Sequence, residues 1–222
     1  MQIRADLHVH TTYSKDSLIT PKDLVYYAKK RGLNACAVTD HNSLEGAYKI
    51  AKETDFLIIP GMEVSSADGH IVALNVHELI PRGLSAVETV EHIHRARGVA
   101  IACHPYASLK GCLGDKVYGA FDAIEVINAR AFPYKRSVRK AQAASERYSL
   151  PQVAGTDAHY GPQIGSGYTE VDAEASTVKA VLDAIMAGKC SAHGGPAPAS
   201  TNVMLTMKRL QRLILNGGKK EQ

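Results

Sequence analysis

The sequence predicts a single (β/α) barrel-like domain with a parallel sheet, followed by a C-terminal helical extension. Short apolar runs alternate with helical patterns along almost the whole chain, which is typical of parallel strands joined by helices. The 222 residues are 45% apolar, which is enough to fill one large core. A Gly- and Pro-rich break at 194–200 precedes the last amphipathic segment. We therefore place one domain at 1–193 and a linker with a helical extension at 194–222.

The first half of the chain predicts four strands joined by helices. Apolar runs of strand length predict strands over 3–8, 35–39, 56–59 and 70–76. Three helices are expected between and after them, the first ending at Gly32, the second near Glu53 and the third near Gly98. Each of these helices begins with a capping signal. The signals are Thr20 before Pro21, Asn42 with Glu45, and Ser85 with Glu88.

The second half repeats the pattern without an internal repeat or a second domain. Strands are predicted over 99–103, 123–127 and 152–154. Helices are predicted over 134–148 and 176–186, the latter stopped by Gly188. A final amphipathic helix over 202–215 presents an apolar face for docking on the barrel or on a partner. The sequence leaves the oligomeric state open.

Charge and composition exclude several classes of protein. The formal net charge is +4, from 26 basic and 22 acidic residues, which suits an anionic substrate but is too mild to indicate nucleic-acid binding. No apolar run reaches the length of a membrane span, and the N-terminus lacks the apolar stretch of a signal peptide. We expect a soluble cytoplasmic protein with no membrane partner. The four cysteines show no CxxC spacing, so we interpret them as reduced thiols, mostly buried.

Histidine and carboxylate residues gather at the ends of the predicted strands. His8 and His10 lie two residues apart at the end of the first strand, so both point to one face and can bind one metal ion. By contrast, His92 and His94 fall in a helix, where side chains two apart diverge, and we interpret them as surface or packing residues. The carboxyl ends of parallel barrel strands meet on one face. The residues there are Asp40, His41, Glu63, His104, Asp157 and His159, and His70 joins them from a strand start.

This mixture of imidazole and carboxylate groups predicts a site for divalent cations. Zn, Mn or Fe would suit such ligands, and no cysteine is placed to favour a thiolate site. Two or three ions close together require a bridging carboxylate and lower the pKa of bound water towards neutrality. A metal-bridging hydroxide can then attack a phosphate ester in line. The sequence therefore predicts metal-dependent phosphate-ester hydrolysis.

Five stretches resemble the motifs of the PHP (polymerase and histidinol phosphatase) family, in the family's order. The stretches are DLHVHTTYSKDS, AVTDH, GMEV followed by GH, CHP, and GTDAH, between residues 6 and 159. The resemblance implies a distorted seven-stranded (β/α) TIM-like barrel that holds three divalent ions. The family includes phosphatases, nucleases and domains attached to DNA polymerases.

Carried over residue by residue, the resemblance implies three metal sites. Glu63 would bridge the first and second ions, and Glu63, Asp157 and His159 are the residues expected to carry catalysis. The inserted Lys15 departs from the family spacing near Asp16, and some members have histidine there. The implied ligand sets are His8, His10, Glu63 and Asp157 for the first ion, Glu63, His70 and His104 for the second, and Asp16, His41 and His159 for the third.

Three further residues are expected to support the site. Asp40 would orient a histidine rather than bind metal, or else it would be a carboxylate at a helix N-terminus. Arg130 and Asn128 follow the strand AIEVI, in a segment EVINAR that resembles a recurring one in small PHP phosphoesterases. Arg130 can contact phosphate oxygens in a bidentate manner, so we interpret both residues as substrate-binding. A solvated loop arginine is the alternative.

The leading hypothesis is a phosphoesterase acting on a small phosphorylated metabolite, such as a nucleotide or a nucleoside bisphosphate. A nuclease uses the same chemistry, but the sequence lacks an aromatic-plus-basic stripe, with no Trp and 3 Phe. A non-catalytic metal-binding scaffold is the third hypothesis, and amide hydrolysis is a fourth because amidohydrolases also use multi-histidine barrels. Residues after Gly194 are expected to be dispensable for the metal site.

Overall fold

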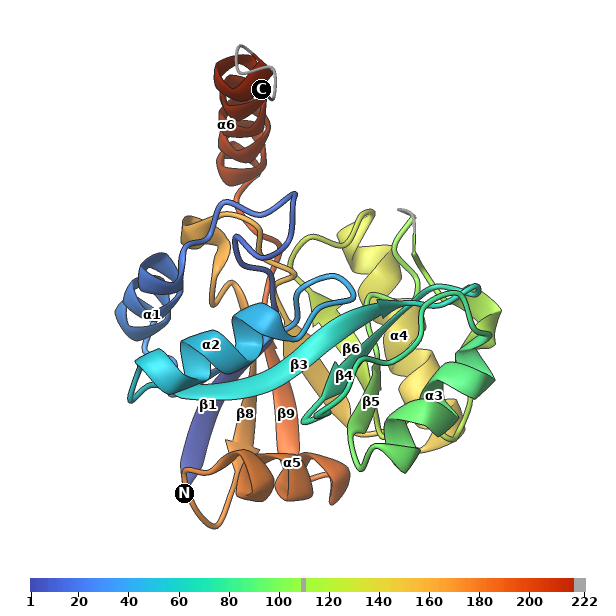
Figure 1. The fold of residues 1–222 in the computed structure, drawn as a ribbon. Coiled ribbons are helices and arrows are strands. Elements are labelled where there is room, and N and C mark those ends of the chain that lie inside the picture. Colours follow the sequence, from blue (N-terminus) through green and yellow to red (C-terminus); the bar gives the residue numbers. More distant parts are fainter. Residues whose placement is uncertain (109–110, 218–222) are drawn as a thin grey trace.

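In the computed structural model, residues 1–108 and 111–217 are described, and one nine-stranded sheet curves into a nearly closed barrel surrounded by helices (Figure 1). The strands lie in the order β7-β6-β5-β4-β3-β2-β1-β8-β9. They are β1 (Gln2–Val9), β2 (Ala35–Val38), β3 (Leu57–Ser65), β4 (His70–Leu74), β5 (Val99–Ala102), β6 (Ala123–Asn128), β7 (Gln152–Gly155), β8 (Gly167–Asp172) and β9 (Cys190–Gly194). The helices are α1 (Pro21–Lys30), α2 (Glu45–Glu53), α3 (Ala86–Arg95), α4 (Tyr134–Tyr148), α5 (Val178–Met186) and α6 (Ala199–Gly217), with short 3-10 turns η1 (Gly114–Lys116) and η2 (Gly161–Gln163).

Strands β1 to β7 form the barrel, which confirms the predicted fold class. The segment after β7 returns to β1 through a parallel bridge between Val9 and Ala158. The backbone N–H of Asp157 donates to the carbonyl of His8 at 2.8 Å at the same place. Strands β8 and β9 extend the sheet from the first half of β1, which raises the strand count from the expected seven to nine.

The sheet is mixed, so the expectation of a parallel sheet is wrong for part of the barrel. β4 runs antiparallel to both β3 and β5, and β8 runs antiparallel to β1 and β9. Four residues, 66–69, connect β3 to β4. Such a short connection makes a hairpin, because parallel neighbours need a crossover of about a dozen residues or more.

Strand β3 continues through Pro60 and Gly61, although the sequence pattern predicted that it ends at Ile59. Pro60 is the last residue of β3 paired with β2, and Gly61 is the first paired with β4. Proline is tolerated there because the strand changes partners at that point. A Cβ on Gly61 would lie 2.7 Å from the carbonyl oxygen of Ala73, so only glycine allows β4 to approach this closely. The extension carries Glu63 up to the carboxyl end of the barrel.

Strands β8 and β9 were not predicted from the sequence. β8 carries Thr169 and Glu170 among its six residues, and all five residues of β9 are partly or fully exposed. Neither strand therefore shows the apolar run that identifies a buried strand. The 193/194 domain boundary falls one residue before the end of β9, and it stays a prediction.

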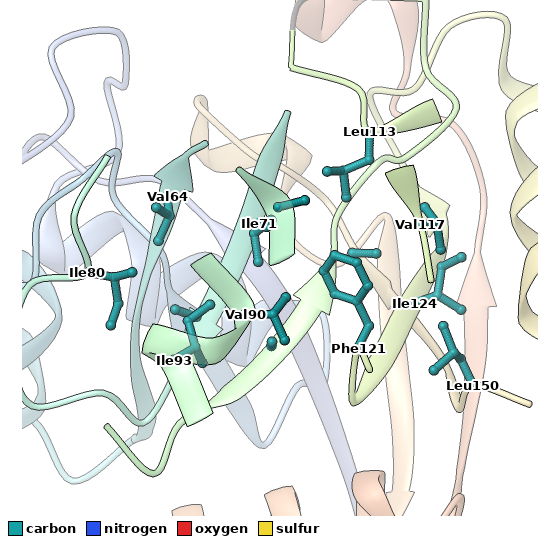
Figure 2. Close-up of a cluster of buried hydrophobic side chains, with 14 of the residues drawn as sticks. Val64, Ile71, Ile80, Val90, Ile93, Leu113, Val117, Phe121, Ile124 and Leu150 are labelled. Atoms are coloured by element: carbon teal, nitrogen blue, oxygen red, sulfur yellow. The ribbon is translucent and has the colours of Figure 1, made fainter. Parts of the chain in front are cut away.

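Three apolar clusters hold the fold together. Ile3, Ala5 and Leu7 of β1 point into the barrel, where α5 covers the end opposite α6 (Figure 1). A second cluster packs β1 and β2 against α1 and α2. Figure 2 shows the third cluster, in which Val90 and Ile93 of α3 lie against strands β3 to β6. Fully burying one such aliphatic side chain stabilises the fold by roughly 1.5–3 kcal/mol.

Two of the three predicted helix caps are present. Thr20 with Asp23 and Ser85 with Glu88 form reciprocal capping boxes at α1 and α3. The cap predicted at Asn42 is wrong, because α2 begins later and Leu44 is its N-cap. Asn42 has a left-handed backbone, φ +50°, and its side chain bonds to Ser65 beside the site.

The remaining predictions concern α6, the membrane and the cysteines. Among the described side chains of α6, Leu205 is buried while Val203 and Leu210 are exposed, and the side chain of Leu213 lies outside the described part. In residues 1–108 and 111–217 no helix has the length and apolar character needed to cross a membrane. All four cysteines are unpaired, two of them buried and two half-buried.

Candidate metal centre

The candidate ligands converge on the carboxyl end of the barrel. His8 lies in β1, Glu63 lies in β3, and His104 follows β5. His70 begins β4 and pairs with Ser65, the last residue of β3. Because β4 runs antiparallel, its first residue lies at the same edge as the carboxyl ends of the parallel strands. This explains how His70, at the start of its strand, lies beside the other candidate ligands.

Glu63 lies at the centre of the cluster and is 1% exposed. Its Oε1 lies 2.8 Å from His70 Nδ1 and 2.9 Å from His104 Nε2. Its Oε2 lies 2.8 Å from His41 Nδ1. Burial alone would raise the pKa of Glu63, but the surrounding histidines, His8 above all, hold it well below its usual value. A carboxylate with ligands on both sides is positioned to bridge two cations.

His8, His10 and Asp157 form a second part of the cluster. The two Nε2 atoms face each other at 3.2 Å, and Asp157 Oδ1 lies 3.2 Å from His10 Nε2 and 3.8 Å from His8 Nε2. Burial and the neighbouring His159 lower the pKa of His10 to about 3. Burial opposes charging of His8, yet Glu125, Glu63 and Asp157 together raise its pKa well above 6.5.

Asp16 bridges two histidines at the mouth of the cleft. Its Oδ2 lies 2.9 Å from His159 Nε2 and 3.6 Å from His41 Nε2. Burial opposes ionisation of Asp16, but these two imidazoles lower its pKa below the usual value. His41 is also desolvated, yet Asp16 and Glu63 raise its pKa to about 10. Asp16 therefore lies where the resemblance implies a ligand, despite the shifted local spacing.

The residues present fit divalent cations. Buried Asp16 Oδ1 lacks a hydrogen-bond partner among the described residues, and buried Glu63 Oε2 lies 2.8 Å from His41 Nδ1 and 3.3 Å from His10 Nε2 without a hydrogen bond of good geometry. Such carboxylate oxygens are costly to bury unless a cation balances them. Four groups place one ligand atom of each member within 4.8 Å of the others. The groups are His8 with His10 and Glu63; Glu63 with His70 and His104; His10 with His41 and His159; and His8 with Cys103 and His104.

Cys103 is a site residue that the sequence analysis did not identify. Its thiol is fully buried and lies 3.7 Å from Glu63 Oε1. Burial, together with the nearby carboxylates, raises the pKa of this thiol well above 9.0. In this environment the Cys103 thiol is protonated at neutral pH, and Cys103 forms no disulfide with a described residue.

Two ligand candidates have a backbone that only glycine adopts readily. His104 has φ +32° and Asp157 has φ +54°. The backbone N–H of His104 donates to Glu125 Oε2 at 2.7 Å, which holds the first of these turns. A Cβ on Gly155 would lie 2.6 Å from Glu125 Oε1, so the glycine before Thr156 and Asp157 lets β7 approach β1 and β6. The surrounding structure thus imposes these conformations on the site.

Glu125 is the clearest omission of the sequence analysis. It is 3% exposed, and its Oε1 lies 3.4 Å from His8 Nδ1. Its Oε2 accepts from the side chain of Asn128 at 2.9 Å as well as from the backbone of His104. A carboxylate against the far nitrogen of a ligand histidine orients the ring. A charged residue within the apolar strand AIEVI was the available signal.

Asp6 is a second residue that the sequence analysis did not identify, and it holds the segment that carries two candidate ligands. Its carboxylate is fully buried and accepts from the backbone and hydroxyl of Thr156 at 2.9 and 2.6 Å. It also accepts from the backbone N–H of Gly165 at 3.1 Å. Burial raises the pKa of Asp6 to about 6. Asp6 therefore ties β1 to the segment that carries Asp157 and His159.

Asp40 lies behind the ligands, as a supporting residue should. Its carboxylate accepts from the backbone and hydroxyl of Thr11 and from the hydroxyl of Ser14, each at 2.7 Å. Ser14 Oγ lies 3.4 Å from His10 Nδ1 and accepts from the backbone N–H of His41 at 3.0 Å. Asp40 thus acts on both histidines through Ser14.

Arg130 and Asn128 lie in the wall of the cleft, which has a volume of about 140 Å³. Arg130 Nη1 donates to the carbonyl of Asp157 at 3.0 Å and also contacts the imidazole of His159. Both ends of the Asn128 amide are engaged, Nδ2 by Glu125 and Oδ1 by the backbone N–H of Arg130. These contacts couple the cationic residue to the metal-binding cluster.

The comparisons with known proteins agree with this arrangement. The model of the PHP domain matches residues 6–106, and that of the PHP-associated region matches residues 135–190. An uncharacterised protein of Methanocaldococcus jannaschii is 38% identical over 141 residues, which cover 57% of this chain and 82% of that protein. A 5'-3' exoribonuclease of Haemophilus influenzae is 33% identical over 108 residues, 46% of this chain and 39% of the nuclease.

A solved structure extends the likeness to the fold. A two-domain protein of Bacteroides vulgatus, described as containing a predicted PHP-like metal-dependent phosphoesterase, superposes with a TM-score of 0.72. The match covers 88% of this chain and 65% of that one at 19% identity. Both family models match in order on a barrel whose candidate ligands meet at one edge, so the chain belongs to the PHP family.

Proposed function

We propose that this protein hydrolyses a phosphate ester of a small phosphorylated metabolite, with nucleotides and nucleoside bisphosphates as the leading class. The observation that carries the proposal is the composition of the cleft. Its wall combines acidic and imidazole ligands with the guanidinium group of Arg130, within about 140 Å³.

Three divalent ions, Zn, Mn or Fe, are part of the proposal. Bound there, they would supply Lewis-acid stabilisation of the charge that develops on a phosphoryl group. Glu63 would bridge two of them, since its two oxygens face different histidines. The proposed ligand sets are His8, His10, Glu63 and Asp157; Glu63, His70 and His104; and Asp16, His41 and His159.

The chain's own residues orient the substrate. Arg130 is half-buried and fixed at Nη1 by the carbonyl of Asp157, and its Nε and Nη2 groups donate to none of the described residues, so they can donate to phosphate oxygens in the cleft. Asn128 fixes the backbone of Arg130 and acts on the substrate through it. Asp157 and His159 both contact Arg130, so the groups expected to carry catalysis also position the proposed phosphate-binding residue.

A nuclease is the second candidate. The observation in its favour is the similarity to the exoribonuclease of Haemophilus influenzae, of which the chain spans 39%. The two candidates share the metal-binding residues and differ in how much of the substrate lies outside the cleft. The cytoplasmic location expected from the sequence remains a prediction.

A hydrolysis panel after loading with Mn or Zn separates the candidates. Phosphate release from mononucleotides and bisphosphates, with an intact oligonucleotide, supports the monoesterase. Strand cleavage supports the nuclease, and silence on every substrate with metal verified as bound supports a non-catalytic scaffold. The His8→Ala/His10→Ala double variant should be inactive. The matched control is His92→Ala/His94→Ala on α3, where His94 pairs with Asp122 away from the cleft.

A further inference from the structure

A second cavity, of about 540 Å³, lies beside the metal cleft. Its walls come from α1, from η2 and from the C-terminal helix α6. Tyr160 lines it and directly follows His159, which lines the metal cleft. Leu18 also lines it, and its backbone N–H donates to the carbonyl of His159 at 2.9 Å. The two spaces therefore share a wall.

The helix α6 is held against this wall by residues three or four positions apart. Asn202 accepts from Gln163 of η2 at 2.8 Å, and Leu205 is 3% exposed. Arg209 contacts the backbone carbonyl of Asp16 and lies 3.5 Å from its carboxylate. Arg212 donates to the carbonyl of Ser17 at 3.3 Å. These contacts place the start of α6 over the loop that carries a candidate metal ligand (Figure 1).

The second cavity combines aromatic rings with cations. Tyr27 and Tyr160 lie in its wall, and the Lys208 ammonium lies 5.9 Å from the centre of the Tyr160 ring. Arg212 adds a second cation, and the Gln211 amide can both donate and accept. The one acidic residue in the lining, Asp23, already accepts from the backbone and hydroxyl of Thr20. Aromatic faces stack with nucleobases, and cations bind phosphate.

The metal cleft and the second cavity differ in volume, so they suit different parts of a substrate. The metal cleft offers about 140 Å³ and the second cavity about 540 Å³, so the second cavity suits the larger part of a nucleotide better. The second cavity falls within the range of about 300–1,000 Å³ typical of small-molecule sites. The cavity lined by tyrosines and cations shares a wall with the metal cleft, so it is positioned to take the part of the substrate that bears the scissile phosphate.

We propose that the cavity between α1, η2 and α6 is a nucleotide-binding subsite. It takes the base and a second phosphate of a substrate whose scissile phosphate lies in the metal cleft. Tyr27 and Tyr160 contact the base, while Lys208 and Arg212 bind the second phosphate. This inference rests on the proposed phosphoesterase function and adds to it the place where substrate specificity is set.

Lys208→Glu tests the subsite directly. Among the described residues, the Lys208 ammonium contacts the ring of Tyr160 and none of the groups that hold α6 against the barrel. The substitution therefore removes a proposed substrate contact and leaves the attachment of α6 in place. Lys189→Glu is the matched control, because Lys189 is exposed and lies between α5 and β9 at the opposite end of the barrel. KM and kcat are measured for a nucleoside bisphosphate and for ribose 5-phosphate, which lacks the base and the second phosphate.

Lys208→Glu should raise KM for the bisphosphate by about tenfold or more, the loss expected for one charge-assisted contact. KM for ribose 5-phosphate and both kcat values should stay within about twofold. The same weakening should appear when the bisphosphate is titrated calorimetrically into protein kept in a chelator. An equal change for both substrates, no change for the bisphosphate, or the same change in Lys189→Glu would overturn the subsite.

The calorimetric titration separates failure of the subsite from failure of the proposed function. If the wild-type protein hydrolyses neither compound but binds the bisphosphate in a manner sensitive to Lys208, the phosphoesterase proposal fails on these substrates and the subsite stands. If both compounds are hydrolysed with equal KM values and Lys208→Glu changes neither, the subsite fails and the phosphoesterase stands.

Discussion

Replacing Glu125 with glutamine tests how the metal centre is organised. In the native protein, the two carboxylate oxygens of Glu125 face different groups. Oε2 accepts from the backbone of His104 at 2.7 Å and from Asn128 at 2.9 Å, and Oε1 faces His8 Nδ1 at 3.4 Å. Glutamine has nearly the same size, but it offers one acceptor and one donor where glutamate offers two acceptors. The substitution therefore changes hydrogen bonding with little change in packing.

The surroundings dictate which way the new amide turns. If its NH2 group faced His104 and Asn128, two buried donors would lose their acceptor, at a cost of about 1–3 kcal/mol each. The amide oxygen therefore takes the Oε2 position, and the NH2 group faces His8 Nδ1. In the neutral imidazole that metal binding requires, that nitrogen must then accept a hydrogen bond, which places the single ring proton on Nε2. The Nε2 atom faces Glu63 and Asp157 and is the atom needed for metal binding.

Glu125→Gln should weaken metal binding by about 10–100-fold, the usual effect of removing the partner of a ligand histidine. A competitive titration against a coloured chelator measures the affinity, and unfolding in excess chelator measures the metal-free stability. Glu170→Gln is the control, because Glu170 pairs with Arg4 at 2.9 Å on β8, away from the cleft. If Glu125→Gln holds its metal as tightly as the control does, the orienting role of Glu125 is refuted.

Three further predictions use the same cleft. The His8→Ala/His10→Ala variant should abolish hydrolysis and lower the metal content measured after dialysis, and full activity would refute the site. Arg130→Ala should raise KM about tenfold and weaken inhibition by phosphate at unchanged metal content, as steady-state kinetics would reveal. The pKa of His41 is raised from 6.5 to about 10, because Asp16 and Glu63 outweigh its burial. The proton on His41 therefore stabilises the metal-free protein below pH 6.5, and this contribution is lost as the pH rises towards 10. Metal must displace that proton, so affinity should rise with pH across this range, and calorimetry in buffers of different ionisation enthalpy should detect proton release.

The candidate ligands could be brought together from the sequence because they follow strands that the apolar pattern makes plain. The run ACAVT is a buried strand on pattern alone, so Asp40 and His41 had to lie at its end. His70 was harder, since the pattern of apolar residues gives no strand direction. The four-residue connection between β3 and β4 is the feature that makes β4 antiparallel and brings His70 to the cleft.

The supporting residues were less visible, for a physical reason. Asp6 and Glu125 lie inside strands, where a carboxylate is expensive to bury without partners. Their hydrogen-bond partners are distant in sequence or reached only by a tight turn. These partners are Thr156 and Gly165 for Asp6, and the backbone of His104 and the side chain of Asn128 for Glu125. A charge within an apolar strand signals that such partners exist, but the three-dimensional arrangement decides what they are.

The C-terminal helix shows why a periodic pattern can mislead. The apolar pattern suggested a face made by Val203, Leu205, Leu210 and Leu213. Among the described side chains, those that meet the barrel are instead Asn202, Leu205, Arg209 and Arg212. Asn202 contributes one hydrogen bond to this face, and Leu205 contributes one buried apolar side chain. The arginines bind backbone carbonyls of the loop that carries Asp16, so the helix is held at the site by polar contacts rather than by a core.

The exposed residues of a helix attached in this way can be substituted without disturbing the barrel. The apolar clusters that stabilise the fold draw on β1 to β8 and α1 to α5, and none of their buried members comes from the described side chains of α6. Substitutions at Lys208 or Gln211 should therefore alter which substrate binds, while the metal-binding residues and the stability stay the same. We accordingly expect Gln211→Ala to shift KM for nucleotides that differ in their base, with an unchanged midpoint of thermal unfolding. A drop in that midpoint comparable to a core truncation would mean that α6 belongs to the fold rather than to the substrate.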